Sequence, residues 1–352
     1  MKYQLYKPQA INELGGRENQ EDAIFPLMGQ ASESQRVFVV CDGMGGMAKG
    51  EVASDAVSKT LGTTAEARLN AAQTFTDSDF HRCMEHAYDA LDAADVSNEG
   101  SMGTTMTFLC LHAGGCLAAH IGDSRIYHLR PSLGPDKGVL YRSRDHSLVQ
   151  HLYEKGGISY NEMGTSQRRN NILKAVQPHQ DGRIRATQAH ITDIRPGDYF
   201  YLCTDGMLEH MEDDGLMSIL ANDMLTDEQK RQRLIDATLN NGDNHSAYLI
   251  HVKDVVAEPG DENQHSDEKE LRARSKALND TRKDQAWKAA SQSVRPKMQS
   301  QSDRPSAEPH VAARNYVRMK PQQPVKPQKT TKVPKFLLSL VALVSDKLKK
   351  KP

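Results

Sequence analysis

The 352-residue sequence contains no Cys-x-x-Cys pair, and no apolar run approaches the ~20 residues that span a bilayer. Its cysteines are odd in number and scattered, and several lie in apolar runs, where free cysteine behaves as a small hydrophobe (Cys41, Cys83, Cys110, Cys116, Cys203). This usage argues against a zinc site and favours a reducing compartment. Residues 1–10 lack the apolar core of a secretory signal peptide, so we expect a cytoplasmic protein.

The sequence also has little net charge, with a formal value of −1, but its charges are unevenly distributed along the chain. Residues 258–352 contain 21 Lys and Arg against 11 Asp and Glu, a net charge of +10, so the preceding residues carry −11. We expect no nucleic-acid partner, because a basic patch would have to lie on the C-terminal tail. An acidic body suits a protein that gathers divalent cations.

The most informative stretch of the sequence is residues 37–46. Residues 37–41 are consecutive apolar residues rich in β-branched and aromatic types, which predicts a strand buried on both faces. We expect the strand to stop at Asp42, followed by a glycine-rich turn at residues 43–46. Asp42 would then be a carboxylate held at the end of a rigid element.

Elsewhere the sequence predicts further strands and helices in one domain, residues 1–254. The expected strands are 104–111, 116–121, 126–130, 199–203 and 246–252, with a hairpin turn at 113–115. The expected helices are 51–61, 76–95, 148–152 and 226–239.

Acidic residues recur beside turn-forming residues, several of them at the ends of these strands (Glu21, Asp22, Asp42, Asp123, Asp205, Asp243). Carboxylates gathered in one place repel one another, and a hard divalent cation with oxygen ligands relieves that repulsion, which points to Mg²⁺ or Mn²⁺. Spacing alone leaves a second interpretation open, in which these are separate turn residues on different surfaces.

A set of short motifs in one order resembles the PP2C-type, metal-dependent serine/threonine phosphatases, most closely their bacterial branch. The motifs are Arg17-x-x-x-Glu21-Asp22, residues 42–46, Gly103-Thr104-Thr105, Gly122-Asp123-Ser124-Arg125, Asp145-His146-Ser147, Cys203-Thr204-Asp205-Gly206 and Asp243-Asn244. The resemblance covers roughly residues 10–252. It implies an α+β fold, a four-layer αββα sandwich of two antiparallel sheets flanked by helices.

The resemblance also implies roles for individual residues. Asp42 would bridge two metal ions, with Glu21 and the Gly43 carbonyl on one side and Asp205 and Asp243 on the other. Asp22 and Asn244 would lie just outside these ligands, and Asp123 would serve a third, weaker metal. Arg17 would grip the substrate phosphate, since its planar fork suits two oxygens.

The implied reaction is hydrolysis of phosphoserine and phosphothreonine on proteins by a hydroxide that the two metals share. A cysteine-nucleophile phosphatase is not expected, because the chain has no Cys-x₅-Arg loop, and Cys41 and Cys203 are interpreted as core residues. Met44 stands where eukaryotic members carry a histidine proposed as general acid. In the family, a segment called the flap is followed by a Thr and a Gly, and this chain has Leu173 and Gln177 at those positions. Thr204 stands where the family usually has Ser, and we expect this replacement to leave function unchanged.

The remaining expectations concern partners and the tail. Phosphorylated proteins and a Ser/Thr kinase are the expected partners, and the alternative is a phosphatase-like scaffold that binds phosphoproteins without turnover. Residues 255–334 are expected to be a disordered linker. Residues 335–352 combine a short apolar run with lysines, and two interpretations are open for them: a peripheral anchor at the inner face of the membrane through 335–351, or a helix that docks on protein.

Overall fold

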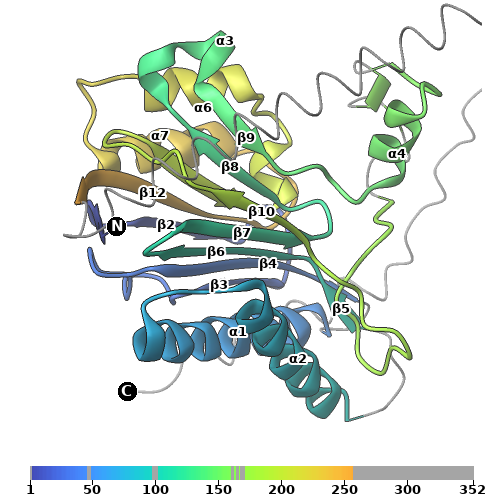
Figure 1. Ribbon diagram of the computed structural model, residues 1–352. Coiled ribbons are helices and arrows are strands. Elements are labelled where there is room, and N and C mark those ends of the chain that lie inside the picture. Colours follow the sequence, from blue (N-terminus) through green and yellow to red (C-terminus); the bar gives the residue numbers. More distant parts are fainter. Residues whose placement is uncertain are drawn as a thin grey trace, which may run out of the picture. The chain divides into compact units, whose positions relative to one another are not determined.

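The computed structural model describes residues 2–45, 49–96, 102–159, 162–163, 166 and 171–256 (Figure 1). Contacts divide the chain into two units, Met1–Asp280 and Thr281–Pro352, and the description below concerns the first. The expectations for residues 257–334 and 335–352 lie outside the described residues. No helix in the described part of the chain combines the length and the apolar character needed to cross a membrane.

Two six-stranded sheets form the centre of the domain, and every strand pair in them is antiparallel. The first has the order β1 (Lys2–Leu5), β12 (His245–Val256), β11 (Tyr199–Cys203), β8 (Arg125–Leu129) and β9 (Val139–Arg142), with β2 (Gln9–Glu13) also beside β12. The second has the order β10 (Thr187–Ile191), β7 (Gly115–Ile121), β6 (Met106–His112), β4 (Val37–Gly45) and β3 (Asp22–Phe25), with β5 (Met102–Thr104) beside β4.

Strand β4 shows why its apolar residues are consecutive rather than alternating. Val37, Val39 and Cys41 pack on the side of helices α1 (Gly50–Ala72) and α2 (Asp77–Ala94). Phe38 and Val40 point the other way, into the core between the sheets, where Phe38 meets Tyr248 of β12 edge-on with ring centroids 5.1 Å apart. Both faces of β4 are therefore buried, which confirms the prediction for residues 37–41.

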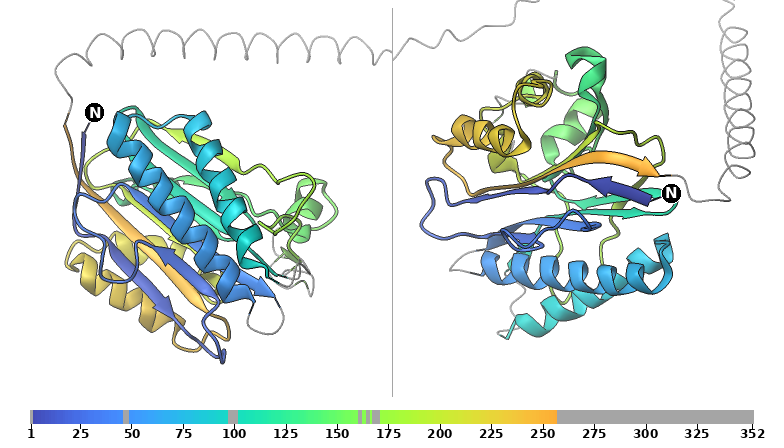
Figure 2. Two further views of the ribbon diagram at one scale, coloured as in Figure 1. Left: turned by 90° about the horizontal axis from the view of Figure 1, so that it is seen from below. Right: turned by 90° about the vertical axis from the view of Figure 1, so that its left-hand side faces the viewer.

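The outer face of the first sheet is covered by a second pair of helices, α6 (Asp213–Leu220) and α7 (Asp227–Thr238). Tyr201 of β11 packs there with Leu216 and Leu234 from these helices. The layers are thus helices, sheet, sheet and helices, as the right-hand view of Figure 2 shows. This confirms the expected four-layer αββα sandwich.

The helix predictions differ from the structure mainly in length. Helix α2 begins after Thr76, whose hydroxyl accepts a hydrogen bond from the Asp79 amide in a capping box, so its start agrees with the helix expected at 76–95. Helix α1 runs to Ala72 rather than ending at 61. Gly62 lies inside this helix against the Phe25 ring, where a Cβ would overlap the ring, so the glycine permits close packing of helix on sheet.

The strand predictions also need correction at their ends. The run 104–111 is two strands, β5 and β6, which separate at Thr105. Strand β12 continues to Val256, two residues past the expected domain boundary at 254, because its end pairs with β1 in the register Lys2↔Val256. The shorter elements are η1 (Pro131–Leu133), α3 (Pro135–Gly138), α4 (Leu148–Glu154) and η2 (Asp205–Leu208).

Candidate metal centre

Asp42 is held by main-chain and hydroxyl hydrogen bonds to Thr104, the last residue of β5, and to Thr105, which separates β5 from β6. Its amide donates to Thr105 Oγ1 at 2.9 Å, and its carbonyl accepts from the Thr105 amide at 2.8 Å and from Thr104 Oγ1 at 2.9 Å. The expectation that the strand stops at Asp42 is wrong, because β4 continues to Gly45 by pairing with β5. Asp42 is therefore fixed within a strand rather than at its end.

Gly43 lies where three segments come together. Its amide donates to the Glu21 carbonyl at 3.1 Å, and a Cβ at this position would overlap the carbonyl oxygens of Glu21 and Gly50. Gly50, the first residue of α1, is equally confined, since a Cβ there would lie 2.9 Å from Glu21 Cδ. The two glycines together bring Glu21 and the start of α1 against the strand that carries Asp42.

Asp205 and Asp243 come from the opposite sheet. Asp205 follows β11 and begins η2, whereas Asp243 lies just before β12. Asn244 ties this sheet to the loop between β2 and β3: its Oδ1 accepts from the Glu21 amide at 2.9 Å, and its Nδ2 donates to the carbonyls of Leu14 and Asn19 at 2.8 and 3.0 Å.

Asp22 connects the two sheets through a hydroxyl. It is the register partner of Asp42 across β3 and β4, and its Oδ2 accepts from Thr204 Oγ1 at 2.9 Å. The same hydroxyl accepts from the Ser246 amide at 3.0 Å. The contact uses only the hydroxyl, which Ser and Thr share, so the expectation that Thr204 is a silent replacement stays consistent with the geometry.

The acids change one another's ionisation. Asp22 and Asp123 are buried, whereas Asp42, Asp205 and Asp243 are half-buried. Burial raises the pKa of Asp42 well above its usual range, and the nearby carboxylates of Asp22, Asp205, Asp123 and Asp243 raise it further. Burial and the charge of Asp205 likewise raise the pKa of Asp22 to about 7 and that of Asp123 to about 8. The structure thus brings these five predicted residues together.

Glu21 and Arg17 lie at the rim of this cluster. Arg17 is 54% exposed and donates to Asp243 Oδ2 at 2.8 Å, and this bond raises the pKa of the guanidinium. Burial raises the pKa of Glu21, and Arg17 partly opposes that shift. Arg17 is therefore paired with an acid while its outer side is open to an arriving anion.

The donor set fits a hard divalent cation. One oxygen of Asp22 and one of Asp123, Oδ1 in each case, are buried without a hydrogen-bond partner, an arrangement that a cation or an ordered water would complete. The surrounding donors are carboxylate and carbonyl oxygens, which favour Mg²⁺ or Mn²⁺. No three acidic, imidazole or thiol side chains already converge as ligands among the residues that the structure describes, so the fit rests on these oxygens and their chemistry.

Sequence reasoning missed the residues that hold the acids in place. The motif Gly103-Thr104-Thr105 does not by itself indicate that its threonines hold Asp42, and no sequence pattern marks Gly50. The interpretation of Cys41 and Cys203 as core residues is confirmed, because both are fully buried. His146, which lies in one of the motifs, is a hydrogen-bonding residue. Its Nδ1 accepts from the Gly122 amide at 3.2 Å, and its Nε2 lies 2.9 Å from Thr187 Oγ1.

Comparison with known proteins gives matches over the same region. The family model described as "Protein phosphatase 2C" matches residues 15–249. The serine/threonine protein phosphatase PstP of Mycobacterium tuberculosis is 31% identical over 249 residues, which cover 68% of this chain but 43% of the relative's length.

Solved structures agree with this match. The crystal structure of the M. tuberculosis phosphatase PstP/Ppp has a TM-score of 0.58 at 26% identity, covering 71% of this chain and 99% of that one. The catalytic domain of PstP in complex with two manganese ions has a TM-score of 0.56 at 28% identity, covering 72% and 100%.

Proposed function

The chain belongs to the protein phosphatase 2C family, and we propose that it hydrolyses phosphoserine and phosphothreonine on proteins in a metal-dependent reaction. The observation that carries the proposal is the gathering of Asp22, Asp123, Asp205 and Asp243 around Asp42, where burial first and the neighbouring carboxylates second raise the pKa of Asp42. The name of the PstP relative and the two manganese ions in its structure support it.

The proposed ligands follow the two sides of the cluster. Asp42 would be shared by two ions, Mn²⁺ or Mg²⁺, with Glu21 and the Gly43 carbonyl on one side and Asp205 and Asp243 on the other. Asp22, which accepts a hydrogen bond from Thr204, would orient the ligands without binding the two ions itself. Asn244 would fix the loop that carries Glu21. Asp123, with its unpartnered Oδ1, is the proposed residue for a third ion.

When bound, the ions would supply an activated water for the attack on phosphorus and neutralise charge on the phosphoryl oxygens. Arg17 would bind the phosphate from the solvent side, which requires its guanidinium to exchange part of its bond to Asp243 for the incoming oxygens. Met44 carries no proton that it could give to a leaving alkoxide, so this chain's own side chains offer no general acid at that position.

The expected partners are phosphorylated proteins and the Ser/Thr kinase that produces them. The test is release of phosphate from a phosphothreonine peptide by the full chain with Mn²⁺, with Mg²⁺ and with EDTA. We expect turnover with either metal, none with EDTA, and a loss of at least about a hundredfold in Asp42→Asn, because one shared ligand would be removed.

Asp236→Asn is the matched control, since Asp236 is an exposed acid on α7 outside the cluster. Its activity should equal that of the unsubstituted protein. If the folded protein shows no turnover with any metal, the enzyme proposal is contradicted and a phosphoprotein-binding scaffold is favoured.

A further inference from the structure

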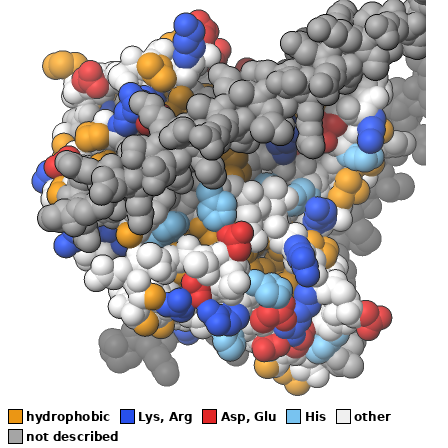
Figure 3. All heavy atoms as spheres, viewed as in Figure 1, with side chains coloured by type: hydrophobic (Ala, Val, Ile, Leu, Met, Phe, Trp, Pro, Cys, Tyr) orange, Lys and Arg blue, Asp and Glu red, His pale blue; other side chains and the backbone are white. Residues whose placement is uncertain are grey.

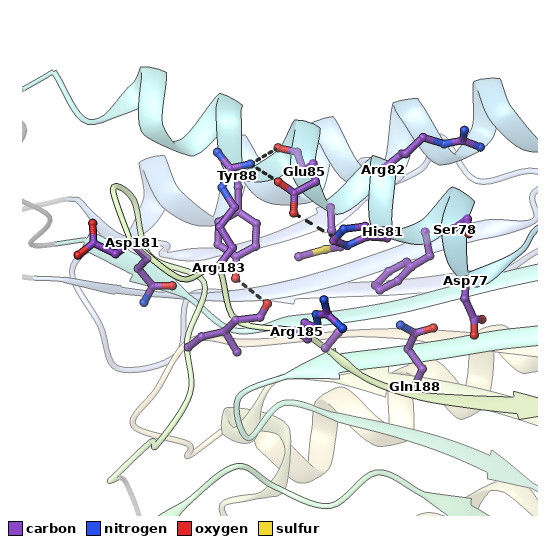
Figure 4. A pocket seen from close by; sticks show the side chains of 15 residues that line it. Asp77, Ser78, His81, Arg82, Glu85, Tyr88, Asp181, Arg183, Arg185 and Gln188 are labelled. Atoms are coloured by element: carbon purple, nitrogen blue, oxygen red, sulfur yellow. Dashed lines mark hydrogen bonds and ion pairs between the residues drawn. The ribbon is translucent and has the colours of Figure 1, made fainter.

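A groove of about 800 Å³ lies between α2 and the segment that leads into β10 (Figure 4). One wall comes from α2, including His81, Glu85 and Tyr88, and the other includes Arg183 and Arg185. Acidic, basic and imidazole side chains gather on this part of the surface in Figure 3. The two arginines differ sharply in what they contact, and that difference points to a role for one of them.

Arg183 binds three acids on successive turns of α2, an arrangement that we call the Arg183 clamp. Its guanidinium lies 2.6 Å from Glu85 Oε2, 2.5 Å from Asp89 Oδ1 and 3.0 Å from Asp92 Oδ2. These bonds raise the pKa of Arg183 above its usual range. Arg185, on the same wall, makes no ion pair within the described part of the chain.

Two further contacts fasten the same segment to α2. The Tyr88 hydroxyl donates to the Ile184 carbonyl at 3.0 Å, while the Arg183 guanidinium lies 5.2 Å from the centre of the Tyr88 ring. The His179 amide donates to Asp92 Oδ1 at 2.7 Å, and His179 has a φ of 55°, a left-handed conformation uncommon for a residue with a side chain. Residues 179–184 are thus anchored at several points.

The inner end of this segment reaches the candidate metal centre. Val176 and Thr104 exchange two main-chain hydrogen bonds, each 2.9 Å long. The Thr104 hydroxyl in turn donates to the Asp42 carbonyl at 2.9 Å. Ion pairs therefore fix one end of residues 176–184 to the acids of α2, and main-chain hydrogen bonds fix the other end to Thr104, which contacts the strand that carries Asp42.

We propose that Arg183 is a positioning residue for the metal centre: by fixing residues 176–184 on α2, it holds Thr104 and hence Asp42 in place. This inference depends on the proposed function in one respect: it assumes that Asp42 is a metal ligand. Arg183 would touch neither substrate nor metal. Its effect would appear as looser Thr104–Val176 bonds and weaker metal binding in a protein that remains folded.

The test compares Arg183→Gln with Arg185→Gln in the full chain. Hydrogen exchange of peptides that contain Thr104 and Val176 reads the bonds directly, and Mn²⁺ titration by calorimetry reads the metal centre without substrate. We expect Arg183→Gln to speed exchange at both positions and to weaken Mn²⁺ binding by about fivefold, within the range of measured coupling effects. Arg185→Gln should leave both unchanged.

Two further variants separate positioning from a general loss of structure. Asp89→Asn removes one of three ion pairs at a side chain that is 63% exposed, so it should fold and show a smaller change in the same direction. Arg183→Lys keeps the positive charge but loses the planar guanidinium that binds several acids at once. It should therefore bind Mn²⁺ more tightly than Arg183→Gln but less tightly than the unsubstituted protein.

Unchanged exchange at Thr104 and Val176 in folded Arg183→Gln would overturn the inference, as would equal effects of the two arginine substitutions. The exchange comparison needs neither turnover nor metal. Failure of the unsubstituted protein to hydrolyse a phosphopeptide would therefore count against the proposed function alone.

Discussion

At the scale of single residues, Asp22 and Asp123 show how the acid cluster lowers the stability of the folded protein when no metal is bound. Their carboxyl groups are buried, and each has one oxygen with no hydrogen-bond partner. Burial, the largest cause, raises the pKa of Asp22 to about 7 and that of Asp123 to about 8. In metal-free protein both groups therefore stay protonated in the folded state at pH values where the unfolded chain has released these protons.

The sign of the pH dependence follows from this difference. Below about pH 4 both states are protonated, so the folded protein incurs no penalty from these groups. Between about pH 4 and pH 8 the unfolded chain binds fewer protons, so the free energy of unfolding falls as the pH rises, by about 1.4 kcal/mol for each unit by which the pKa is raised.

Asp123→Asn should consequently be more stable than the unsubstituted protein in EDTA at pH 8, by several kcal/mol, and the difference should vanish towards pH 4. Urea unfolding across this range measures it, with Asp236→Asn as the exposed control. Parallel curves for Asp123→Asn and the unsubstituted protein would contradict the raised pKa.

The acids of the candidate site could be predicted from the sequence, but the residues that hold them in place could not. Asp42, Asp205 and Asp243 lie in short motifs whose order carries the family resemblance. The bond between Thr204 and Asp22 joins positions 182 apart in sequence, and nothing in the local pattern of either one indicates the other. Such contacts depend on how the two sheets stack, which the sequence alone does not specify.

At the scale of elements, β4 and the start of α1 are held together by their glycines. Gly43 and Gly50 bring the strand, the helix and the Glu21 loop to main-chain contact, as overlap of an added Cβ with carbonyl oxygens shows. Gly43 does not require a left-handed conformation, so its role is close approach rather than backbone freedom.

Gly43→Ala should therefore destabilise the fold, by about 2–4 kcal/mol, because backbone atoms rather than a flexible side chain must move. Urea unfolding in EDTA measures the effect in the absence of metal binding. Gly182→Ala is the control, since a Cβ there meets nothing within 4 Å. A Gly43→Ala protein as stable as Gly182→Ala would show that the three segments are less tightly joined than the structure indicates.

Elements were predicted best where a local signal marks them. The helix expected at 76–95 begins and ends within one residue of α2, and the apolar run 199–203 coincides with β11. Helix α1 extends beyond the predicted end at residue 61, across Gly62, a residue type that is unfavourable in a helix interior and that here lies against the Phe25 ring. The β4 strand was predicted to stop at Asp42 because its continuation depends on pairing with β5, some 60 residues away.

At the scale of the whole domain, the candidate site exists only because the two sheets stack. Asp22 and Asp42 lie on strands of one sheet, and Asp205 and Asp243 adjoin strands of the other, with Asp123 on the link between β7 and β8. The four-layer fold could be predicted from the family resemblance. The layers of buried side chains themselves follow from the alternation along each strand, as on β4.

The most direct measurement of the central claim is anomalous X-ray diffraction from a crystal of the full chain grown with Mn²⁺. The account predicts two manganese ions between the sheets, with Asp42 shared, Glu21 and the Gly43 carbonyl on one ion, and Asp205 and Asp243 near the other. A crystal in which Mn²⁺ binds elsewhere, or in which these acids remain protonated and paired with one another at saturating Mn²⁺, would contradict it.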